Sequence, residues 1–318
     1  MIHGTTPNCC TRRVMNKRVK KRVARFLILG VVTFFVFQFT SGCFSFRMSQ
    51  KEMAKYFADK PVKPITHDLQ VDDRTIRYVS AGEDSKPTVI FFHGAPGSWS
   101  AFVDFLADTS LLDQACLVSI DRPGYGHSDF GKSEYSLKRQ AELMAPVLKK
   151  HKSTPNILVG HSLGGPVIAR MAMDYPALVD ALIMVAPSID PGLEPNEDWF
   201  RAPLYTPLLR WILPTSFRVT NDEIYFLEDE LIEMMPLWEN IKAPVTVIQG
   251  TEDKLVPAGN ADFAKEQLVN SPEVKIVLEE GMNHFVPWQR PGLIKTAITY
   301  YISKPWWDWN TTELGKPQ

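Results

Sequence analysis

A serine flanked by glycines is the residue of this chain best suited to covalent chemistry. Ser162 lies in the run Gly160-His161-Ser162-Leu163-Gly164, which follows an apolar stretch at residues 156–159 and precedes a helix-like stretch at residues 166–175. A serine in a tight turn between a strand and a helix presents its hydroxyl above the end of the strand, beside the first N–H groups of the helix. Glycine and serine are also common in ordinary turns, so the spacing predicts a nucleophile only if the surrounding residues can support one.

A base and an acid for such a serine can be chosen from their positions in the chain. A serine hydroxyl needs a base to take its proton, and a histidine oriented by a carboxylate is suited to that task. His284 follows the last expected strand, and Asp253 follows the strand before it. Loops at the carboxyl ends of parallel strands share one edge of the sheet, where Ser162 also emerges. We therefore expect Ser162, Asp253 and His284 to act together, with Glu252 and Asp190 as alternative positions for the acid.

Two backbone N–H groups are expected to stabilise the oxyanion that forms when the serine attacks a carbonyl group. One belongs to Leu163, directly after the nucleophile. The other belongs to Ala95, in the loop His93-Gly94-Ala95-Pro96-Gly97 that follows the apolar stretch at residues 87–92. The proline after Ala95 has no N–H to donate. We expect the amides of Ala95 and Leu163 to form the oxyanion hole.

The elements that must position these residues alternate along the chain. Strands are expected at residues 74–80, 87–92, 115–120, 157–160, 181–185, 245–249 and 274–278, and helices at residues 134–150, 162–175, 259–269 and 290–302. Most of the strands are nearly continuous apolar runs, as strands covered on both faces should be. This alternation predicts an α/β fold with a mostly parallel sheet and helices on both faces.

The alternation is interrupted once, between Pro187 and Ile241. This segment has no strand signal and is rich in proline and aromatic residues, the latter being Trp199, Phe200, Tyr205, Trp211, Phe217, Tyr225, Phe226 and Trp238. A structureless loop of that length is uncommon in a compact domain. We expect residues 188–240 to form a small helical cap inserted after the sixth strand of the sheet. Its aromatic side chains would contact an apolar part of the substrate or pack on the body.

The chain resembles the α/β-hydrolase superfamily over about residues 65–303. The resemblance rests on five motifs in order: His93-Gly94-Ala95-Pro96-Gly97, Asp121-Arg122-Pro123-Gly124-Tyr125-Gly126-His127-Ser128, Gly160-His161-Ser162-Leu163-Gly164-Gly165, Gly250-Thr251-Glu252-Asp253 and Gly281-Met282-Asn283-His284. It implies a core of residues 65–187 and 241–304 and the chain order nucleophile, acid, histidine. In that superfamily the second motif is a structural loop, so Ser128, His93, His127 and His161 are expected to shape loops.

The resemblance implies a serine hydrolase whose default substrate is a carboxylic ester with an apolar group. Amidase or aminopeptidase, carbon–carbon bond hydrolase and haloperoxidase-like activities use the same residues, and the fold does not choose among them. The serine argues against epoxide hydrolases and haloalkane dehalogenases, which resemble this superfamily but have aspartate at the same turn. A binding protein without turnover, or a scaffold in the cell envelope, is the alternative outside enzymes.

Composition limits the partners of the protein. The 318 residues have a formal net charge of -1 and are 45% hydrophobic, which is typical of a globular protein and gives no electrostatic basis for nucleic-acid binding. No phosphate-binding loop, nucleotide fingerprint or metal-ligand spacing is present, so we expect no cofactor and no metal. Cys116 lies in an apolar run and is expected to be a buried core residue.

The N-terminal segment, residues 1–43, is expected to direct the chain to a membrane. Its charged side chains are all basic, and they precede an apolar run at residues 26–39 and then Thr40-Ser41-Gly42-Cys43. The run is short of the ~20 residues of a membrane span and fits a signal peptide. Small residues before a cysteine resemble a bacterial lipoprotein cleavage site, with lipid attached to Cys43. An uncleaved signal anchor, simple secretion and a start at Met15 remain alternatives.

The protein is thus expected in the bacterial cell envelope, held at a membrane. Residues 44–64 would be a polar connector between that segment and the core. Residues 305–318 form a tryptophan-rich tail without an assigned role, and nothing in the sequence indicates the oligomeric state.

Overall fold

The computed structural model describes residues 21–22, 25–26, 28–30 and 46–304. The chain divides into two units, Met1–Phe44 and Ser45–Gln318, and the fold described below is that of the second. Cys43 and the tail at residues 305–318 lie outside the described residues, so the expectations for them stay predictions. Within the described part of the chain, no helix is both long enough and apolar enough to cross a membrane.

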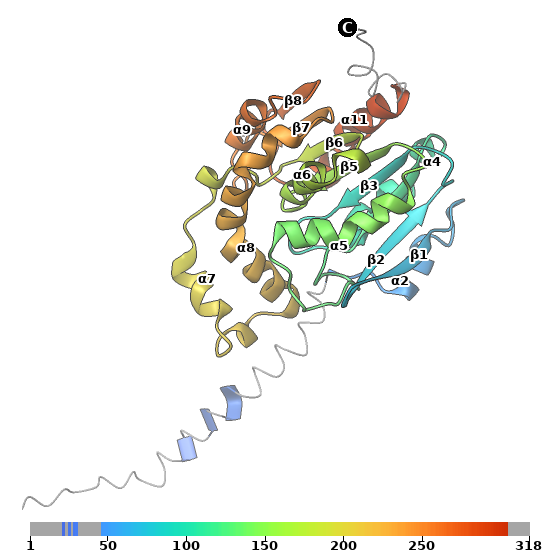
Figure 1. Ribbon diagram of the computed structural model, residues 1–318. Helices are drawn as coiled ribbons and strands as arrows, with labels where there is room; N and C mark the ends of the chain where they lie inside the picture. Colours follow the sequence, from blue (N-terminus) through green and yellow to red (C-terminus); the bar gives the residue numbers. More distant parts are fainter. Residues whose placement is uncertain (1–20, 23–24, 27, 31–45, 305–318) are drawn as a thin grey trace, which may run out of the picture. The chain divides into compact units, whose positions relative to one another are not determined.

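An eight-stranded sheet forms the centre of this unit (Figure 1). Its strands are β1 (Ile65–Val71), β2 (Arg74–Ala81), β3 (Thr88–Phe92), β4 (Cys116–Ile120), β5 (Asn156–His161), β6 (Ala181–Val185), β7 (Val245–Gly250) and β8 (Val274–Glu279). They lie in the order β1-β2-β4-β3-β5-β6-β7-β8. Strand β2 pairs antiparallel with both β1 and β4, and all the other pairs are parallel, so the carboxyl ends of β3 to β8 share one edge of the sheet.

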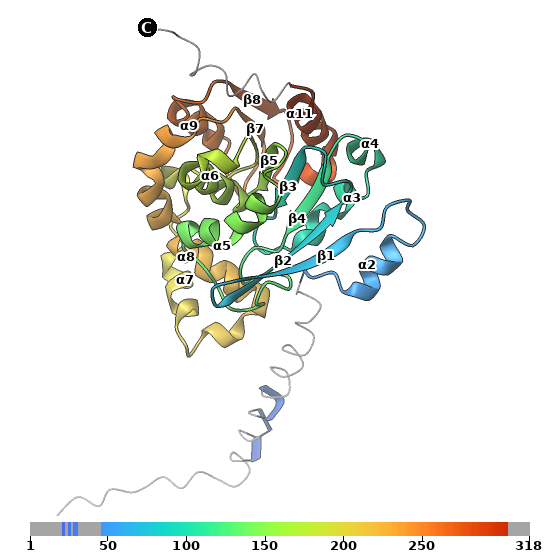
Figure 2. The same ribbon diagram turned by 45° about the vertical axis from the view of Figure 1, so that its right-hand side comes forward.

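Helices cover both faces of the sheet (Figures 1 and 2). They are α2 (Gln50–Tyr56), α3 (Val103–Leu106), α4 (Thr109–Leu112), α5 (Leu137–Lys150), α6 (Gly164–Asp174), α7 (Asp198–Tyr205), α8 (Thr215–Met234), α9 (Gly259–Gln267), α10 (Val286–Gln289) and α11 (Pro291–Ser303). Helices α5, α6 and α9 contribute to one hydrophobic cluster, and α3, α4 and α11 contribute to another. The sheet separates the two clusters, because successive side chains of a strand point to opposite faces.

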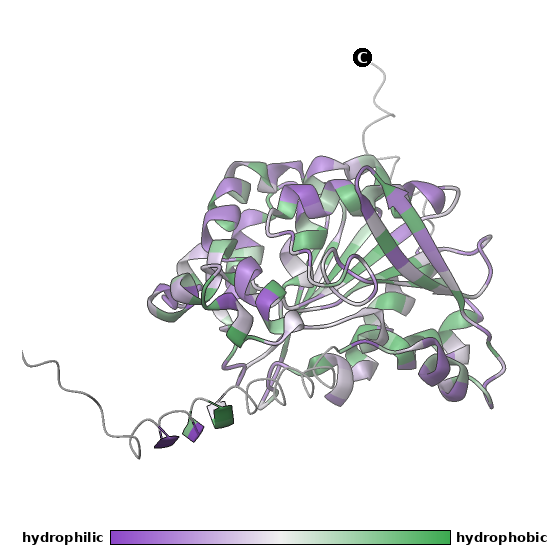
Figure 3. Cartoon of the chain, turned by 90° about the horizontal axis from the view of Figure 1, so that it is seen from below, coloured by the Kyte–Doolittle hydropathy of each residue, from purple (hydrophilic) through white to green (hydrophobic). Residues whose placement is uncertain are grey.

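The hydrophobic pattern of the strands explains why the sheet was predictable. All residues of β3, β4 and β6 are buried, as expected for parallel strands covered on both faces. In Figure 3 the central strands are coloured as hydrophobic, whereas the helices alternate between hydrophobic and hydrophilic residues. The expected fold class is confirmed, and each of the expected strands and helices is present with ends shifted by a few residues.

Elements at the beginning of this unit were not predicted. Strand β1 is an edge strand whose residues are all exposed or half-buried, so it lacks the apolar run that marks the inner strands. The expected polar connector contains α2, which has no buried residue but begins with a capping box of Ser49 and Glu52. Just after α2, Phe57 is buried in the core. The short helices α3 and α4 were also missed, because four residues are too few to show a helical period.

Between β6 and β7 the chain leaves the sheet and forms helices. Three short 3₁₀ helices, Pro191–Leu193, Arg210–Ile212 and Met235–Asn240, accompany α7 and the 20-residue α8. No strand occurs anywhere in this stretch, all of which the structure describes. Helix α8 lies beside α7 at one side of the sheet (Figure 1). We call residues 188–240 the cap.

Candidate active site

Ser162 occupies a strained turn between β5 and α6. Its φ is 55°, in the left-handed region that residues other than glycine rarely adopt. Its N–H donates to the carbonyl of Val185 at 2.9 Å, and its own carbonyl accepts from the N–H of Gly165 at 2.8 Å. These backbone hydrogen bonds hold the turn in place, and Ser162 lines a cavity.

Two glycines allow the loops around Ser162 to approach one another. A Cβ on Gly94 would lie 2.9 Å from the Cβ of Ser162, and one on Gly164 would lie 2.3 Å from the carbonyl oxygen of Phe92. Both distances are shorter than van der Waals contact, so a larger residue would displace its neighbour. The loop after β3 can therefore contact the turn after β5 only because these positions lack side chains.

The structure brings His284 and Asp253 into direct contact. Nδ1 of His284 lies 2.7 Å from Oδ2 of Asp253, and both side chains are buried. A carboxylate accepts a hydrogen bond, so Nδ1 carries a proton and Nε2 of the neutral ring keeps its lone pair. His284 lines the same cavity as Ser162, as the expected arrangement of nucleophile and base requires.

Asp253 is held by further donors. Its Oδ1 accepts from the N–H groups of Leu255 and Val256, each at 2.9 Å, and Nε2 of Gln249 lies 3.3 Å from Oδ2. Burial acts to raise the pKa of Asp253, but the hydrogen bonds from His284 and the two backbone amides outweigh it and lower the pKa. The carboxylate thus stays charged beside the imidazole. Gln249 was missed in the sequence, although a polar residue at the end of an apolar strand is a usable signal.

The alternative positions for the acid have other roles. Asp190 caps the 3₁₀ helix Pro191–Leu193 by accepting from the N–H of Gly192 at 2.8 Å. Glu252 is exposed, and its N–H donates to the carbonyl of Met282. Neither side chain has a hydrogen bond to His284 in the part of the chain that is described.

The other motif residues hold loops. Nε2 of His161 donates to the carbonyl of His284 at 3.1 Å. Burial, with His284 close by, lowers the pKa of His161 to about 3, so its ring stays neutral. The hydroxyl of Ser128 donates to the carbonyl of Asp121 at 2.7 Å and accepts from the N–H of Arg77 at 2.8 Å. Among the described residues, the hydroxyl of Ser128 thus has hydrogen bonds to two backbone groups and none to a basic side chain.

Ala95 and Leu163 line the same cavity as Ser162. Leu163 is the N-cap residue of α6, where N–H groups lack partners within the helix and the helix dipole favours negative charge. Within residues 46–304, neither N–H donates to a protein acceptor. Both donors are therefore available to an oxygen atom bound next to Ser162.

The cavity has a volume of about 650 Å³, the size range of a site for a small molecule. The apolar part of its wall comes largely from the cap and the end of the sheet: Phe217, Ile224, Leu227, Leu255, Phe285 and Trp288. Among the described residues, the charged side chains that line the cavity all come from one part of the cap: Glu194, Glu197 and Arg201. Burial raises the pKa of Glu194, and Arg201 is paired with Glu197. The cavity wall is thus mainly apolar, and its charged residues lie together in the part of the cap that contains Glu194, Glu197 and Arg201.

The aromatic residues of the cap mostly do not face the cavity. Phe217 is the one that lines it. Trp199 and Trp211 are 80% and 60% exposed, whereas Trp238 is buried and packs against Phe263. The number of aromatic residues in the cap is therefore weak evidence for an apolar substrate, because most of them do not line the cavity.

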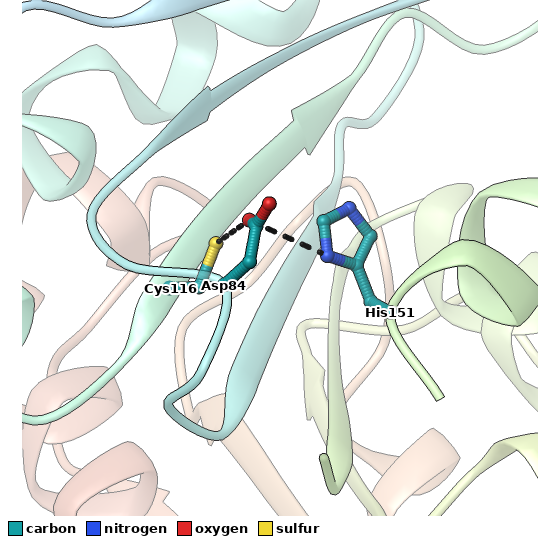
Figure 4. Close-up of side chains that lie close together, drawn as sticks. All are labelled: Asp84, Cys116 and His151. Atoms are coloured by element: carbon teal, nitrogen blue, oxygen red, sulfur yellow. Dashed lines mark hydrogen bonds and ion pairs between the residues drawn. The ribbon is translucent and has the colours of Figure 1, made fainter. Parts of the chain in front are cut away.

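A trio of potential metal ligands lies away from this site. Asp84, Cys116 and His151 have donor atoms within 4.8 Å of one another (Figure 4), where β4 begins rather than where the strands end. The Cys116 thiol donates to Oδ1 of Asp84 at 3.4 Å. Burial and the nearby carboxylate raise the pKa of Cys116 to about 12. The geometry is that of a protonated thiol hydrogen-bonded to a carboxylate.

Comparison with known proteins identifies relatives of the fold. The family model described as α/β hydrolase fold matches residues 87–209. A 2-(acetamidomethylene)succinate hydrolase of Mesorhizobium japonicum is 24% identical over 251 residues, which are 69% of this chain and 88% of the relative. An epoxide hydrolase of Caenorhabditis elegans is 28% identical over 195 residues, 61% of this chain and 44% of the relative.

Solved structures share the same architecture. The structure of a membrane phospholipase A, described as a bacterial virulence factor, has a TM-score of 0.59 and 18% identity, and the match covers 90% of this chain and all of the other. At this identity the likeness concerns the fold. Sheet order, the matched family model and the named relatives agree that the chain has the α/β-hydrolase fold, and the relatives named above are hydrolases.

Proposed function

We propose that this protein is a serine hydrolase that cleaves a carboxylic ester of a small, largely apolar substrate through an acyl-enzyme. The observation that carries the proposal is the cavity lined by both Ser162 and His284, whose Nδ1 is hydrogen-bonded to Asp253. A nucleophile beside a base whose other nitrogen is held by a carboxylate is the arrangement needed for acyl transfer. The apolar wall suits an acyl chain or an apolar alcohol.

The proposed reaction begins at the hydroxyl of Ser162. Nε2 of His284 takes its proton while Oγ attacks the ester carbonyl, and the charged carboxylate of Asp253 stabilises the imidazolium that forms. The carbonyl oxygen becomes an oxyanion and accepts from the amides of Ala95 and Leu163. His284 then gives the proton to the leaving alcohol. Water, activated in the same way, releases the acid from Ser162.

Labelling with a fluorescent fluorophosphonate tests the nucleophile directly. We expect the full-length chain to be labelled and to hydrolyse short p-nitrophenyl esters, and Ser162→Ala to lose both properties without a change in thermal unfolding. Ser100→Ala is the matched control, because Ser100 lines the same cavity but lies outside the proposed machinery. Labelling of Ser162→Ala, or unchanged turnover, would exclude Ser162 as the nucleophile.

An amide substrate with a free amino group is the second candidate. The observation in its favour is the pair of carboxyl groups, Glu194 and Glu197, in the cavity wall, since carboxylates bind ammonium groups. Aminoacyl p-nitroanilides distinguish the two candidates. Faster turnover of anilides than of matched esters, lost on Glu197→Gln, would favour the amide substrate. The serine nucleophile argues against epoxide hydrolysis, although one relative has that name.

We further propose that lipid on Cys43 attaches the enzyme to the bacterial cell envelope. The support is the basic segment, the apolar run and the small residues before Cys43. Cys43→Ser is expected to prevent processing and to change the partition between membrane and soluble fractions. Mass spectrometry that finds the wild-type N-terminus uncleaved and unmodified would contradict this proposal.

A further inference from the structure

A buried arginine from a distant motif binds the loop that contains Ala95. Arg122 follows β4 and is fully buried. Its Nε donates to the carbonyl of His93 at 2.8 Å, and its Nη2 lies 3.4 Å from the carbonyl of Gly94. The second motif therefore supports the loop after β3 with a permanently charged donor.

The side chain of His93 supplies a second donor to the carbonyl of Gly94. The N–H of Arg122 donates to Nε2 of His93 at 3.0 Å. A backbone amide can only donate, so Nε2 is unprotonated and the ring proton is on Nδ1. Nδ1 lies 2.6 Å from the Gly94 carbonyl oxygen and donates to it. Burial, reinforced by the charge of Arg122, holds the pKa of His93 well below its ordinary value, so the ring remains neutral.

The carbonyl of Gly94 and the N–H of Ala95 belong to one peptide unit. This peptide is trans, so its C=O and N–H point in opposite directions within one plane. Fixing the carbonyl with two donors fixes the direction of the Ala95 N–H on the other side. Donors on the carbonyl also polarise the peptide and strengthen its N–H as a donor.

The charge of Arg122 is balanced from the cap. Its Nη1 and Nη2 bind the two carboxylate oxygens of Glu223 in α8 at 2.7 and 3.1 Å. Glu223 also accepts from the hydroxyl of Tyr125 at 2.6 Å and from Nε2 of Gln140 at 2.8 Å. Removing one partner of a buried ion pair leaves an uncompensated charge, so Glu223 of α8 stabilises the charge of Arg122, whose Nη1 also donates to Oε1 of Gln140 at 2.9 Å.

We infer that Arg122 is a positioning residue for the Ala95 amide and that Glu223 couples the cap to the oxyanion hole. The inference rests on the proposed function, because it concerns the same oxyanion. It adds that the cap does more than enclose substrate, since the location of α8 sets the direction of one oxyanion donor. Arg122 acts through the peptide of Gly94 and touches no reacting atom.

Arg122→Lys and Glu223→Gln test the inference. Both variants are compared with the wild type for kcat and KM on p-nitrophenyl esters and for the Ki of a trifluoromethyl ketone, which forms an oxyanion on the serine. Loss of one oxyanion donor lowers kcat about 10²- to 10³-fold. We expect about a 10²-fold loss of kcat in Arg122→Lys and a smaller loss in Glu223→Gln, with KM within about threefold and Ki raised in parallel with the loss.

Arg170→Lys is the matched control. Arg170 is buried too, and it is paired with Asp174 at 2.8 Å and with Glu233 of α8 at 3.5 Å, but it donates to no carbonyl of the Ala95 loop. We expect it to lower the melting temperature while leaving kcat and Ki unchanged. An equal loss of kcat in this control would overturn the inference, because the effect would then come from stability or from the cap in general.

A second variant covers the case in which Arg122→Lys does not fold. Arg122→Met combined with Glu223→Leu leaves no buried charge, and such replacements are often tolerated. It should fold and show the same loss of kcat. Wild-type kcat in this double variant overturns the inference. If the wild type itself is not labelled by a fluorophosphonate, the proposed function fails instead, so the two failures are distinguishable.

Discussion

The site has two halves, one around Ser162 that consists mainly of backbone groups and one around His284 that consists of side chains. The half around Ser162 is made of backbone: a left-handed turn, glycines that permit close approach, and two amide groups. The half around His284 is made of side chains, in which a carboxylate with four donors orients one imidazole. Backbone geometry depends on what the loops pack against, whereas the side-chain pair depends on charge and protonation.

This difference explains where each half receives its support. The backbone half depends on residues far away in the chain, since Glu223 of the cap holds Arg122, which holds the peptide of Gly94. The side-chain half is nearly self-contained, because the partners of Asp253 lie within a few residues of it, apart from His284. Substitutions in the two halves should therefore differ in kind as well as in size.

The largest effect is expected in the side-chain half. Asp253→Asn removes the acceptor that holds the proton on Nδ1 of His284, so the ring can adopt the wrong tautomer. A comparable change in a serine protease lowers kcat about 10⁴-fold, and we expect a loss of about 10³- to 10⁴-fold here with a small change in KM. Asp190→Asn is the control and should keep wild-type kcat. A similar loss in both variants would contradict the assignment of the acid.

A smaller loss is expected in the backbone half. Gly94→Ala adds a Cβ that would lie 2.9 Å from the Cβ of Ser162, so either the serine or the peptide of Ala95 must shift. We expect kcat to fall about 10²-fold, as for the loss of one oxyanion donor. Gly292→Ala is the control, because no atom of the described residues outside its own helix backbone and chain neighbours lies within 4 Å of the added Cβ. Equal activity of Gly94→Ala and the wild type would show that the close approach is not required.

The same contrast sets what could be predicted from sequence. The turn at Ser162, the loop of Ala95 and the positions of Asp253 and His284 are local patterns, each placed after a buried strand with a strong apolar signal. The structure places Ala95, Ser162 and His284 in the lining of one cavity, and Asp253 is hydrogen-bonded to His284.

Other features depend on packing that no local pattern encodes. Arg122 was visible in its motif, but its partner Glu223 lies 101 residues further along the chain. Helix α8 has apolar residues facing both the core and the cavity, so its sequence does not fix which side chain meets Arg122. Strand β1 was missed for a related reason, since an exposed edge strand needs no apolar run.

The cap is expected to affect binding more than chemistry. Phe217 supplies apolar surface to the cavity, and losing such a contact with a substrate chain costs about 1 to 2 kcal/mol. Phe217→Ala should therefore raise KM for an octanoate ester about tenfold and leave KM for an acetate ester nearly unchanged. Trp199→Ala is the control, because Trp199 is 80% exposed and does not line the cavity. A loss of kcat without a change in KM would mean that Phe217 also influences the reacting groups.

Two buried carboxyl groups, Asp253 and Asp121, are expected to affect the pH dependence of stability in opposite directions. Asp253 has an imidazole partner, and its pKa is lowered. Among the described residues, Asp121 accepts hydrogen bonds from the N–H groups of Trp99 and His127, each at 2.7 Å. Burial raises its pKa to about 7, although the nearby charges of Arg77 and Arg47 act to lower it. The lowered pKa of Asp253 in the native state adds to the free energy of unfolding, and this contribution is lost as pH falls below about 4. The raised pKa of Asp121 lowers the free energy of unfolding as pH rises above about 4, because the native state keeps a proton that the unfolded chain releases near pH 4.

The smallest effect is therefore a slope in the stability of the wild type. Between about pH 4 and 7 the unfolded state binds fewer protons at Asp121 than the native state, so the free energy of unfolding should fall as pH rises, by at most about 1.4 kcal/mol per pH unit from this group. Urea denaturation across this range measures it. Asp121→Asn should be less stable at every pH, since one backbone donor loses its acceptor, but its curve should lack this fall. Asp253→Asn should still show the decrease in the free energy of unfolding between about pH 4 and 7. It should differ from the wild type in its pH dependence only below about pH 4. Parallel curves for Asp121→Asn and the wild type would show that the buried carboxyl is ionised well below pH 7.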